Sequence, residues 1–143
     1  MDPYRLQRFV TAQDTDSTYE RARAELLAGR KTSHWMWFVF PQLAGLGRSE
    51  MSRTYAIASL EEARAYLDHP VLGSRLLECA EALLAHSDKS AREILGEIDA
   101  AKLRSSMTLF ARAGEEERSF REVLERYFDG KPDEETERLL GNP

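Results

Sequence analysis

Side chains that could bind a ligand or take part in catalysis gather in one short segment of the chain. Residues 34–49 read HWMWFVFPQLAGLGRS and contain His34 and both tryptophans, Trp35 and Trp37. Indole rings can stack on a planar ligand, and the side-chain amide of Gln42 offers a donor and an acceptor. These residue types predict the wall of a small-molecule site. The competing interpretation is a core element whose indole and imidazole groups are satisfied internally.

The second half of the same segment predicts contact with an anion. Gly45 and Gly47 let the backbone approach a ligand closely, and Arg48 and Ser49 supply donors. Exposed backbone amides beside an arginine suit a phosphate or a carboxylate group. The Gly-x-Gly spacing is neither a P-loop nor a dinucleotide fingerprint, so it names no nucleotide class by itself.

A second group of polar residues lies in residues 98–110, IDAAKLRSSMTLF. On a helix, Asp99, Lys102 and Ser106 fall along one edge of the apolar stripe, and Ser105 lies farther round the same side. A carboxylate, an ammonium and a hydroxyl there can line a pocket. The alternative is structural: Asp99 caps the helix, Lys102 extends over apolar surface, and Ser106 bonds to its own helix.

The charge distribution supports a local anion site. The net charge is −5, which argues against general affinity for nucleic acid. No acid occurs between Glu25 and Glu50, where Arg30 and Lys31 are basic, and residues 100–114 are also free of acids. Two positive windows in an acidic chain indicate a place where a small anion could bind, although chance spacing explains them as well.

Several other chemistries are disfavoured, and we expect neither a metal nor a cofactor. The three histidines are scattered, and a single cysteine cannot build a zinc site or an internal disulfide. Cys79 falls on an apolar helical stripe, which predicts a core thiol. No Gly-x-Ser-x-Gly nucleophile turn is present. The sequence lacks a secretory signal and an apolar run long enough for a membrane helix, so we expect a cytoplasmic protein with no membrane contact.

The elements that must position these residues are predicted to be helices. Helix-start signals are Asp2-Pro3, Ser17 with Glu20, Ser59 with Glu62, Pro70, Ser90 with Glu93, Asp99, Glu115 and Asp133. The expected ranges are 2–11, 17–29, 59–68, 70 onward as the longest helix, a short helix from 90, 99–113, 115–127, and a last one between Asp133 and Gly141. The aromatic segment from His34 to Phe40 fits either a helix or a strand. We predict an all-α fold: a single domain over residues 1–143, one compact bundle of about seven helices, with a glycine-rich loop at residues 43–53 after the aromatic segment.

The longest of these motifs closely resemble a known family. They are GRKTSHWMWFVFPQLAGLGRSEMSRTYAI, SLEEARAYLDHPVLGSRLLE and IDAAKLRSSMTLF, joined by the late pattern at Asp129 to Thr136. They resemble the bacterial family called domain of unknown function 1810, some members of which carry the label calpastatin. The resemblance covers Phe9 to about Leu140, implies a compact, mainly helical domain, and brings no established reaction. The positions that match its pattern are His34, Trp35, Trp37, Pro41, Gln42, Gly45, Gly47, Ser49, Tyr55, His69, Gly73, Asp99, Lys102, Ser105, Ser106 and Thr108.

Three functions remain open. The first is binding of a small anionic, possibly nucleotide-like ligand, with Trp rings on a base and glycine amides with Arg48 or Lys102 on phosphate. The second is hydrolysis of such a nucleotide- or ADP-ribose-like compound at a glycosidic bond, with Asp99 as the carboxylate and His34 or His69 as acid–base partner. The third is a protein-interaction domain that uses the aromatic face. For the first two we expect one concavity lined by His34, Gln42, Ser49, Tyr55, Asp99, Lys102 and Ser106.

Overall fold

The computed structural model of the protein describes residues 2–141 and contains helices but no strand within that range. The helices are α1 Gln7–Asp14, α2 Thr18–Ala28, α3 Met36–Val39, α4 Glu50–Thr54, α5 Leu60–Asp68, α6 Leu72–Leu84, α7 Ala91–Leu95, α8 Glu97–Ala113, α9 Ser119–Phe128 and α10 Glu134–Leu139, with a 3₁₀ turn, η1 Thr15–Ser17, between α1 and α2. The predicted all-α fold is therefore confirmed. None of the helices in this range is long and apolar enough to cross a membrane.

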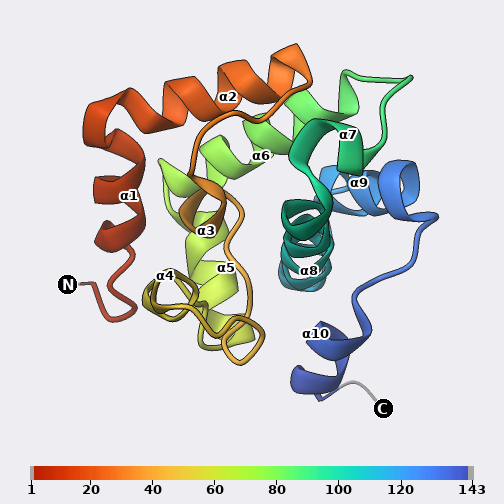
Figure 1. The fold of residues 1–143 in the computed structure, drawn as a ribbon. Helices are drawn as coiled ribbons and strands as arrows, with labels where there is room; N and C mark the ends of the chain where they lie inside the picture. The colour runs from red at the N-terminus through yellow and green to blue at the C-terminus, as the bar shows by residue number, and fades with distance from the viewer. Residues whose placement is uncertain (1, 142–143) are drawn as a thin grey trace.

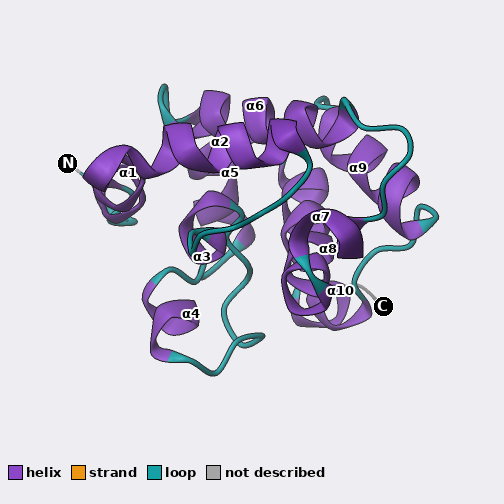
Figure 2. Cartoon of the chain, turned by 45° about the horizontal axis from the view of Figure 1, so that its top comes forward, coloured by secondary structure: helices purple, strands orange, loops and turns teal. Residues whose placement is uncertain are grey.

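Helix α8 is the central element of the structure. It has 17 residues, so it, and not the 13-residue α6 that follows Pro70, is the longest helix of the described chain. It packs against α5, α7, α9 and α10, whereas α6 packs against α2, α5 and α9. Figure 1 shows α2 and α6 running across the top of the molecule and α8 below them, with α10 next to the C-terminus of the chain. Figure 2 shows the segment with α3 and α4 on the other side of α8 from α9.

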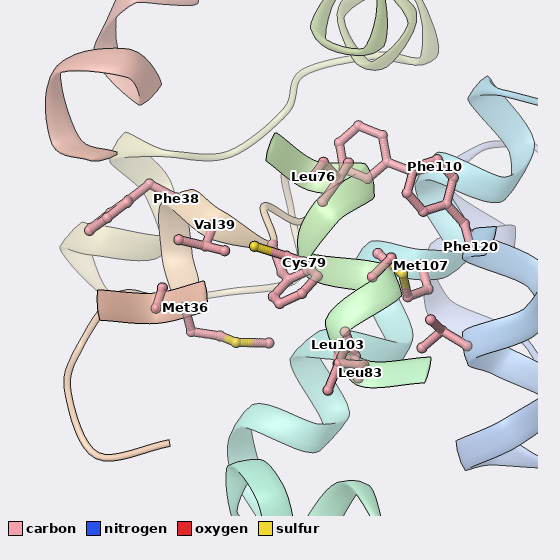
Figure 3. Packing of buried hydrophobic residues seen from close by; sticks show 14 of the residues in the cluster. Met36, Phe38, Val39, Leu76, Cys79, Leu83, Leu103, Met107, Phe110 and Phe120 are labelled. Atoms are coloured by element: carbon pink, nitrogen blue, oxygen red, sulfur yellow. The ribbon is translucent and has the colours of Figure 1, made fainter. Parts of the chain in front are cut away.

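The core is built from the apolar stripes of these helices. The stripe predicted on α6, Leu72, Leu76, Cys79 and Leu83, is fully buried. In Figure 3, side chains from α3, α6, α8 and α9 meet in this core, with Cys79 between the α3 and α8 sides. Burial of such side chains is the main favourable term in folding, at roughly 1.5–3 kcal/mol for each large apolar side chain.

The aromatic segment forms a single helical turn, α3, inside this core. Trp35, Phe38 and Phe40 are buried, whereas Trp37 is half-buried. The buried amide of Gln13 on α1 donates to the Phe38 carbonyl at 2.7 Å. A short run with no polar face thus becomes one turn that is buried except at Trp37.

Several predicted helix starts are confirmed by their capping contacts. Ser90 and Glu93 form a reciprocal capping box at α7, and the Asp133 carboxylate accepts from the Thr136 amide at α10. Ser59 accepts from the Glu62 amide at 3.1 Å. The Ser59 motif does not form a full capping box, because the Glu62 carboxylate accepts from the Ala58 amide and from Arg8 on α1.

Helix α2 begins directly after Ser17 and ends before Gly29, as predicted, but the predicted capping box is absent. Ser17 adopts left-handed backbone dihedrals and makes no side-chain cap, because a 3₁₀ turn joins α1 to α2 at this corner. Two other starts were predicted wrongly. Asp2 does accept from the amides of Leu6 and Gln7, yet α1 begins only at Gln7 because Arg5 is left-handed with φ 53°. Asp99 does not cap its helix, since α8 begins at Glu97.

The structure also contains more, shorter helices than the seven or so expected. Turn α3 and helix α4 lie where no helix was firmly predicted, and α4 occupies residues assigned to the irregular stretch 43–53. Ser49 caps α4 by accepting from the Ser52 amide at 3.1 Å. Helix α9 begins at Ser119, four residues after the predicted start.

Candidate functional site

Asp99 lies between two lysines at the start of α8. The Lys31 Nζ is 2.9 Å from one carboxylate oxygen of Asp99, and the Lys102 Nζ is 3.8 Å from the other. Side-chain exposure is 9% for Lys31, 19% for Asp99 and 23% for Lys102. We call these three residues the Lys–Asp–Lys cluster. It carries one more positive charge than negative, in a setting that is partly shielded from water.

Each ammonium of the cluster also lies over an indole ring. Lys31 Nζ is 5.0 Å from the centroid of Trp35, and Lys102 Nζ is 5.2 Å from the centroid of Trp37. Ammonium groups within about 6 Å of a ring centroid are attracted by the ring quadrupole. The two sequence motifs, separated by more than sixty positions, therefore meet at this point.

Glu25 organises the backbone that carries Lys31. Its carboxylate accepts from the amides of Thr32 and Ser33, from the Ser33 hydroxyl, and from Trp35 Nε1 at 2.9 Å. Burial by itself would raise the pKa of Glu25, but the hydrogen bonds from Ser33, Thr32 and Trp35 outweigh it and lower the pKa to about 2. The Lys31 amide in turn donates to the Ile94 carbonyl at 2.8 Å.

Lys31 and Glu25 were both missed as site residues by sequence reasoning. Lys31 does lie in the acid-free window between Glu25 and Glu50, which is the one signal that could have pointed to it. No local spacing pairs it with Asp99. The Trp35 indole, by contrast, matches the structural interpretation given above, because it is buried and its N–H is satisfied internally.

Ser106 follows Lys102 by one helical turn and is completely buried. Its hydroxyl is the buried side-chain polar atom without a hydrogen-bond partner in the described part of the chain. Ser105 behaves as helix serines usually do and donates to the Ala101 carbonyl at 3.3 Å. A buried hydroxyl with no partner costs about 1–3 kcal/mol, so Ser106 is available to a polar atom that can reach it.

Gln42 belongs to a short backbone pairing between the segments on either side of α4. Its carbonyl accepts from the Ile57 amide at 2.9 Å, and the Ile57 carbonyl accepts from Ala44 at 2.7 Å. These bonds form the isolated parallel bridge between Leu43 and Ile57. The Gln42 side chain is half-buried, and no hydrogen bond joins its amide to another residue of the range 2–141.

Tyr55 and His69 make contacts that stabilise the fold. Tyr55 packs its ring against Phe9 and Phe38, with centroids 5.8 and 5.3 Å away. His69 Nδ1 accepts from the amides of Val71 and Leu72, which begin α6.

The loop before α4 contains one close backbone approach and one glycine with a positive φ. A Cβ at Gly47 would lie 2.3 Å from the Ser52 Cβ, and Gly45, with φ 100°, approaches the Leu139 side chain. His34 and Arg48 are exposed.

The structure thus brings together only part of the predicted set. Asp99, Lys102, Trp35 and Trp37 are joined by ion pairs and ring contacts. Within residues 2–141, no hydrogen bond, ion pair or ring contact links Gln42, Ser49, Tyr55 or His69 to that cluster. No group of three or more His, Cys, Asp or Glu residues in this range is arranged to hold a metal ion.

The comparison with protein families decides the assignment of the chain. The family described as "Protein of unknown function (DUF1810)" matches residues 3–140. The chain belongs to the DUF1810 family. Among solved structures, this DUF1810 chain is similar to the conserved hypothetical protein Rv1873 from Mycobacterium tuberculosis, with 50% sequence identity and a TM-score of 0.95. The match covers 98% of this chain and 99% of that one. A search of curated proteins gave no match.

Proposed function

We propose that this DUF1810 protein binds a small anionic, nucleotide-like ligand beside Trp37 and the Lys–Asp–Lys cluster. The observation that carries the proposal is the charge of the cluster, in which two ammonium groups share one carboxylate. An incoming anion can pair with one lysine while Asp99 keeps the other. Asp99 is therefore never left buried without a partner, which would be strongly unfavourable.

Lys102 is the lysine that such an anion would use. Its contact with Asp99 is 0.9 Å longer than that of Lys31, at 3.8 against 2.9 Å, and its side chain is more exposed. A charge-assisted hydrogen bond to phosphate is worth roughly 1.5–3 kcal/mol. Lys31 is held at the end of α7 by its backbone and serves to keep Asp99 in place.

Trp37 supplies the aromatic surface. Its neighbour Trp35 is completely buried, whereas Trp37 is half-buried and within reach of Lys102. Stacking of a base on an aromatic side chain contributes about 1–3 kcal/mol. The free amide of half-buried Gln42 is the polar group best suited to fix the orientation of the ligand, whereas the orphan hydroxyl of Ser106 is completely buried and would be reached only by a ligand group that enters the core.

The loop residues are assigned to the anionic end of the ligand as part of the same proposal. Backbone amides at Gly45 and Gly47, with Arg48 and Ser49, would approach a phosphate. Ser105 stays a peripheral member, because its hydroxyl is already bonded to its own helix. Tyr55 would contribute through the packing that holds the loop.

A protein-interaction role for the aromatic face has less support. Trp35, Phe38 and Phe40 are buried in the core, so Trp37 is the one tryptophan with an exposed part. Large exposed apolar patches mark protein-binding surfaces, and a single half-buried indole is a small one.

The test is ligand binding by Lys102→Ala compared with a matched lysine. Nucleotides, sugar phosphates and ADP-ribose-like compounds are screened by thermal shift, and hits are titrated by calorimetry. We expect Lys102→Ala to weaken binding about ten- to a hundredfold, as loss of a charge-assisted bond implies. Lys131→Ala removes an exposed lysine after α9 and serves as the control. A ligand bound equally by both variants contradicts the proposal.

Turnover is measured in the same experiment, because Asp99 could also support cleavage at a glycosidic bond. In that case Asp99 would stabilise a developing oxocarbenium ion, with His34 or His69 as the proton carrier. Because His69 Nδ1 accepts from the amides of Val71 and Leu72, its Nε2 is the ring nitrogen that would carry the proton. Cleavage that falls at least about a hundredfold in Asp99→Asn, with binding retained, would assign the hydrolase function. Binding without turnover assigns the binding function.

A further inference from the structure

A cavity lined by arginines lies at the N-terminal end of the molecule, away from the Lys–Asp–Lys cluster. Its volume is about 380 Å³, and it is formed by the start of the chain, α1, the end of α4, the segments on either side of α4, and the first turn of α5. Its lining includes three alanines, Tyr4, Arg5, Arg8, Arg53 and Glu62. Three of them are basic and one is acidic, although the chain as a whole is acidic.

Arg8 and Glu62 are charged lining residues whose side chains are mostly buried, and both are committed to the fold. The Arg8 guanidinium donates to the carbonyls of Tyr4, Arg5, Thr54 and Ala56 and to the Glu62 carboxylate. These contacts use all five of its N–H donors. The other carboxylate oxygen of Glu62 accepts from the Ala58 amide at 2.9 Å, and Glu62 is buried. This pair is neutral and saturated.

Arg5 and Arg53 are therefore the residues that set the charge of the cavity. Both are exposed, and neither side chain forms an ion pair or hydrogen bond with another residue in the range 2–141. The nearby acid, Asp2, uses both carboxylate oxygens on the amides of Leu6 and Gln7. Arg5 also holds a left-handed backbone, φ 53°, which arginine rarely adopts.

We propose that this cavity binds the phosphate group of a small phosphate monoester. Two planar guanidinium groups on one cavity match the geometry of a phosphate dianion, which they can contact through paired N–H donors. The volume is within the range of small-molecule sites. The lining alanines leave space near the arginines, and the half-buried Tyr4 ring offers a surface for the organic part.

The experiment is calorimetric titration with inorganic phosphate and with phenyl phosphate at low ionic strength. Arg53→Gln and Arg5→Asn each remove one charge, and asparagine tolerates the left-handed backbone at position 5. We expect each change to weaken phenyl phosphate binding about tenfold or more, as for loss of a charge-assisted bond. Arg92→Gln, at an exposed arginine on α7, and Lys102→Ala should change it less than about twofold.

Every alternative outcome overturns the inference. If neither phosphate compound binds, the cavity is not a phosphate site. If Arg92→Gln weakens binding as much as Arg53→Gln, the effect is one of net charge. If Lys102→Ala abolishes binding while Arg5→Asn and Arg53→Gln retain it, the anion binds at the Lys–Asp–Lys cluster, which would support the function proposed above and refute this site.

Discussion

Replacement of Glu25 by glutamine should destabilise the protein in a way that depends on pH. The carboxylate accepts four hydrogen bonds that fix residues 32–35, and its pKa falls from an ordinary value of 4.5 to about 2. At 1.36 kcal/mol per pKa unit this shift corresponds to about 3 kcal/mol. Solvent screening of a partly exposed group reduces that figure, and we expect a loss of about 1–2 kcal/mol at pH 7.

The direction of the pH dependence follows from the lowered pKa. The contribution of Glu25 to the free energy of unfolding is complete above pH 4.5, its unfolded-state pKa, and is lost as the pH falls through about 2. The difference in stability between the wild type and Glu25→Gln should therefore be constant from pH 7 to about pH 5.5 and shrink toward pH 2.

Urea denaturation followed by circular dichroism at a series of pH values measures this difference. Glu20→Gln, at an exposed glutamate on the same helix α2, is the control, and we expect it to change stability by less than about 0.5 kcal/mol at any pH. The reasoning is refuted if Glu25→Gln destabilises the protein equally at pH 7 and pH 3. It is also refuted if the two variants have the same effect.

Two further predictions concern the close contact between α5 and α6 and the buried thiol. A Cβ at position 73 would lie 2.1 Å from the Leu67 carbonyl oxygen, so Gly73→Ala should lower the free energy of unfolding by about 2–3 kcal/mol. The control, Ser74→Ala in the same turn, should cost less than about 0.5 kcal/mol. Equal denaturation midpoints for the two variants would contradict the close contact. Burial raises the pKa of the Cys79 thiol to about 12, so iodoacetamide should label it at pH 8 only in denaturant, as read by mass spectrometry. Rapid labelling of the native protein would show that the thiol is accessible.

The helices could be predicted where their signals are local. The capping box at Ser90 and the stripe on α6 depend on residues three or four positions apart, and both are confirmed. The Ser17 motif has the same local pattern and does mark the start of α2, but its predicted capping box is absent, because the chain turns sharply between α1 and α2 and places Ser17 in a left-handed conformation. Capping requires extended dihedrals at that position, and a tertiary corner overrides the residue preference.

The candidate site could be predicted only in part for a related reason. Asp99, Lys102 and Ser106 could be predicted from helical spacing, and Trp37 from the concentration of aromatic residues between His34 and Phe40. The pairing of Lys31 with Asp99 joins residues that no periodicity connects, and it exists because the Lys31 amide is bonded to the end of α7. The structural interpretation of this motif expected Ser106 to bond to its own helix, whereas the structure leaves that hydroxyl unpaired.

The five hydrogen bonds of the Arg8 guanidinium affect the order in which parts of the chain can fold during synthesis. Three of its acceptors lie 46, 48 and 54 residues further along the chain. The partners of Glu25, by contrast, lie only 7 to 10 residues away. As a nascent chain leaves the ribosome from its N-terminus, residues 25–35 can adopt their native turn at once. The first eight residues must wait until Glu62 on α5 has emerged, so the beginning of the chain reaches its final position later than the turn at residues 25–35 that follows it.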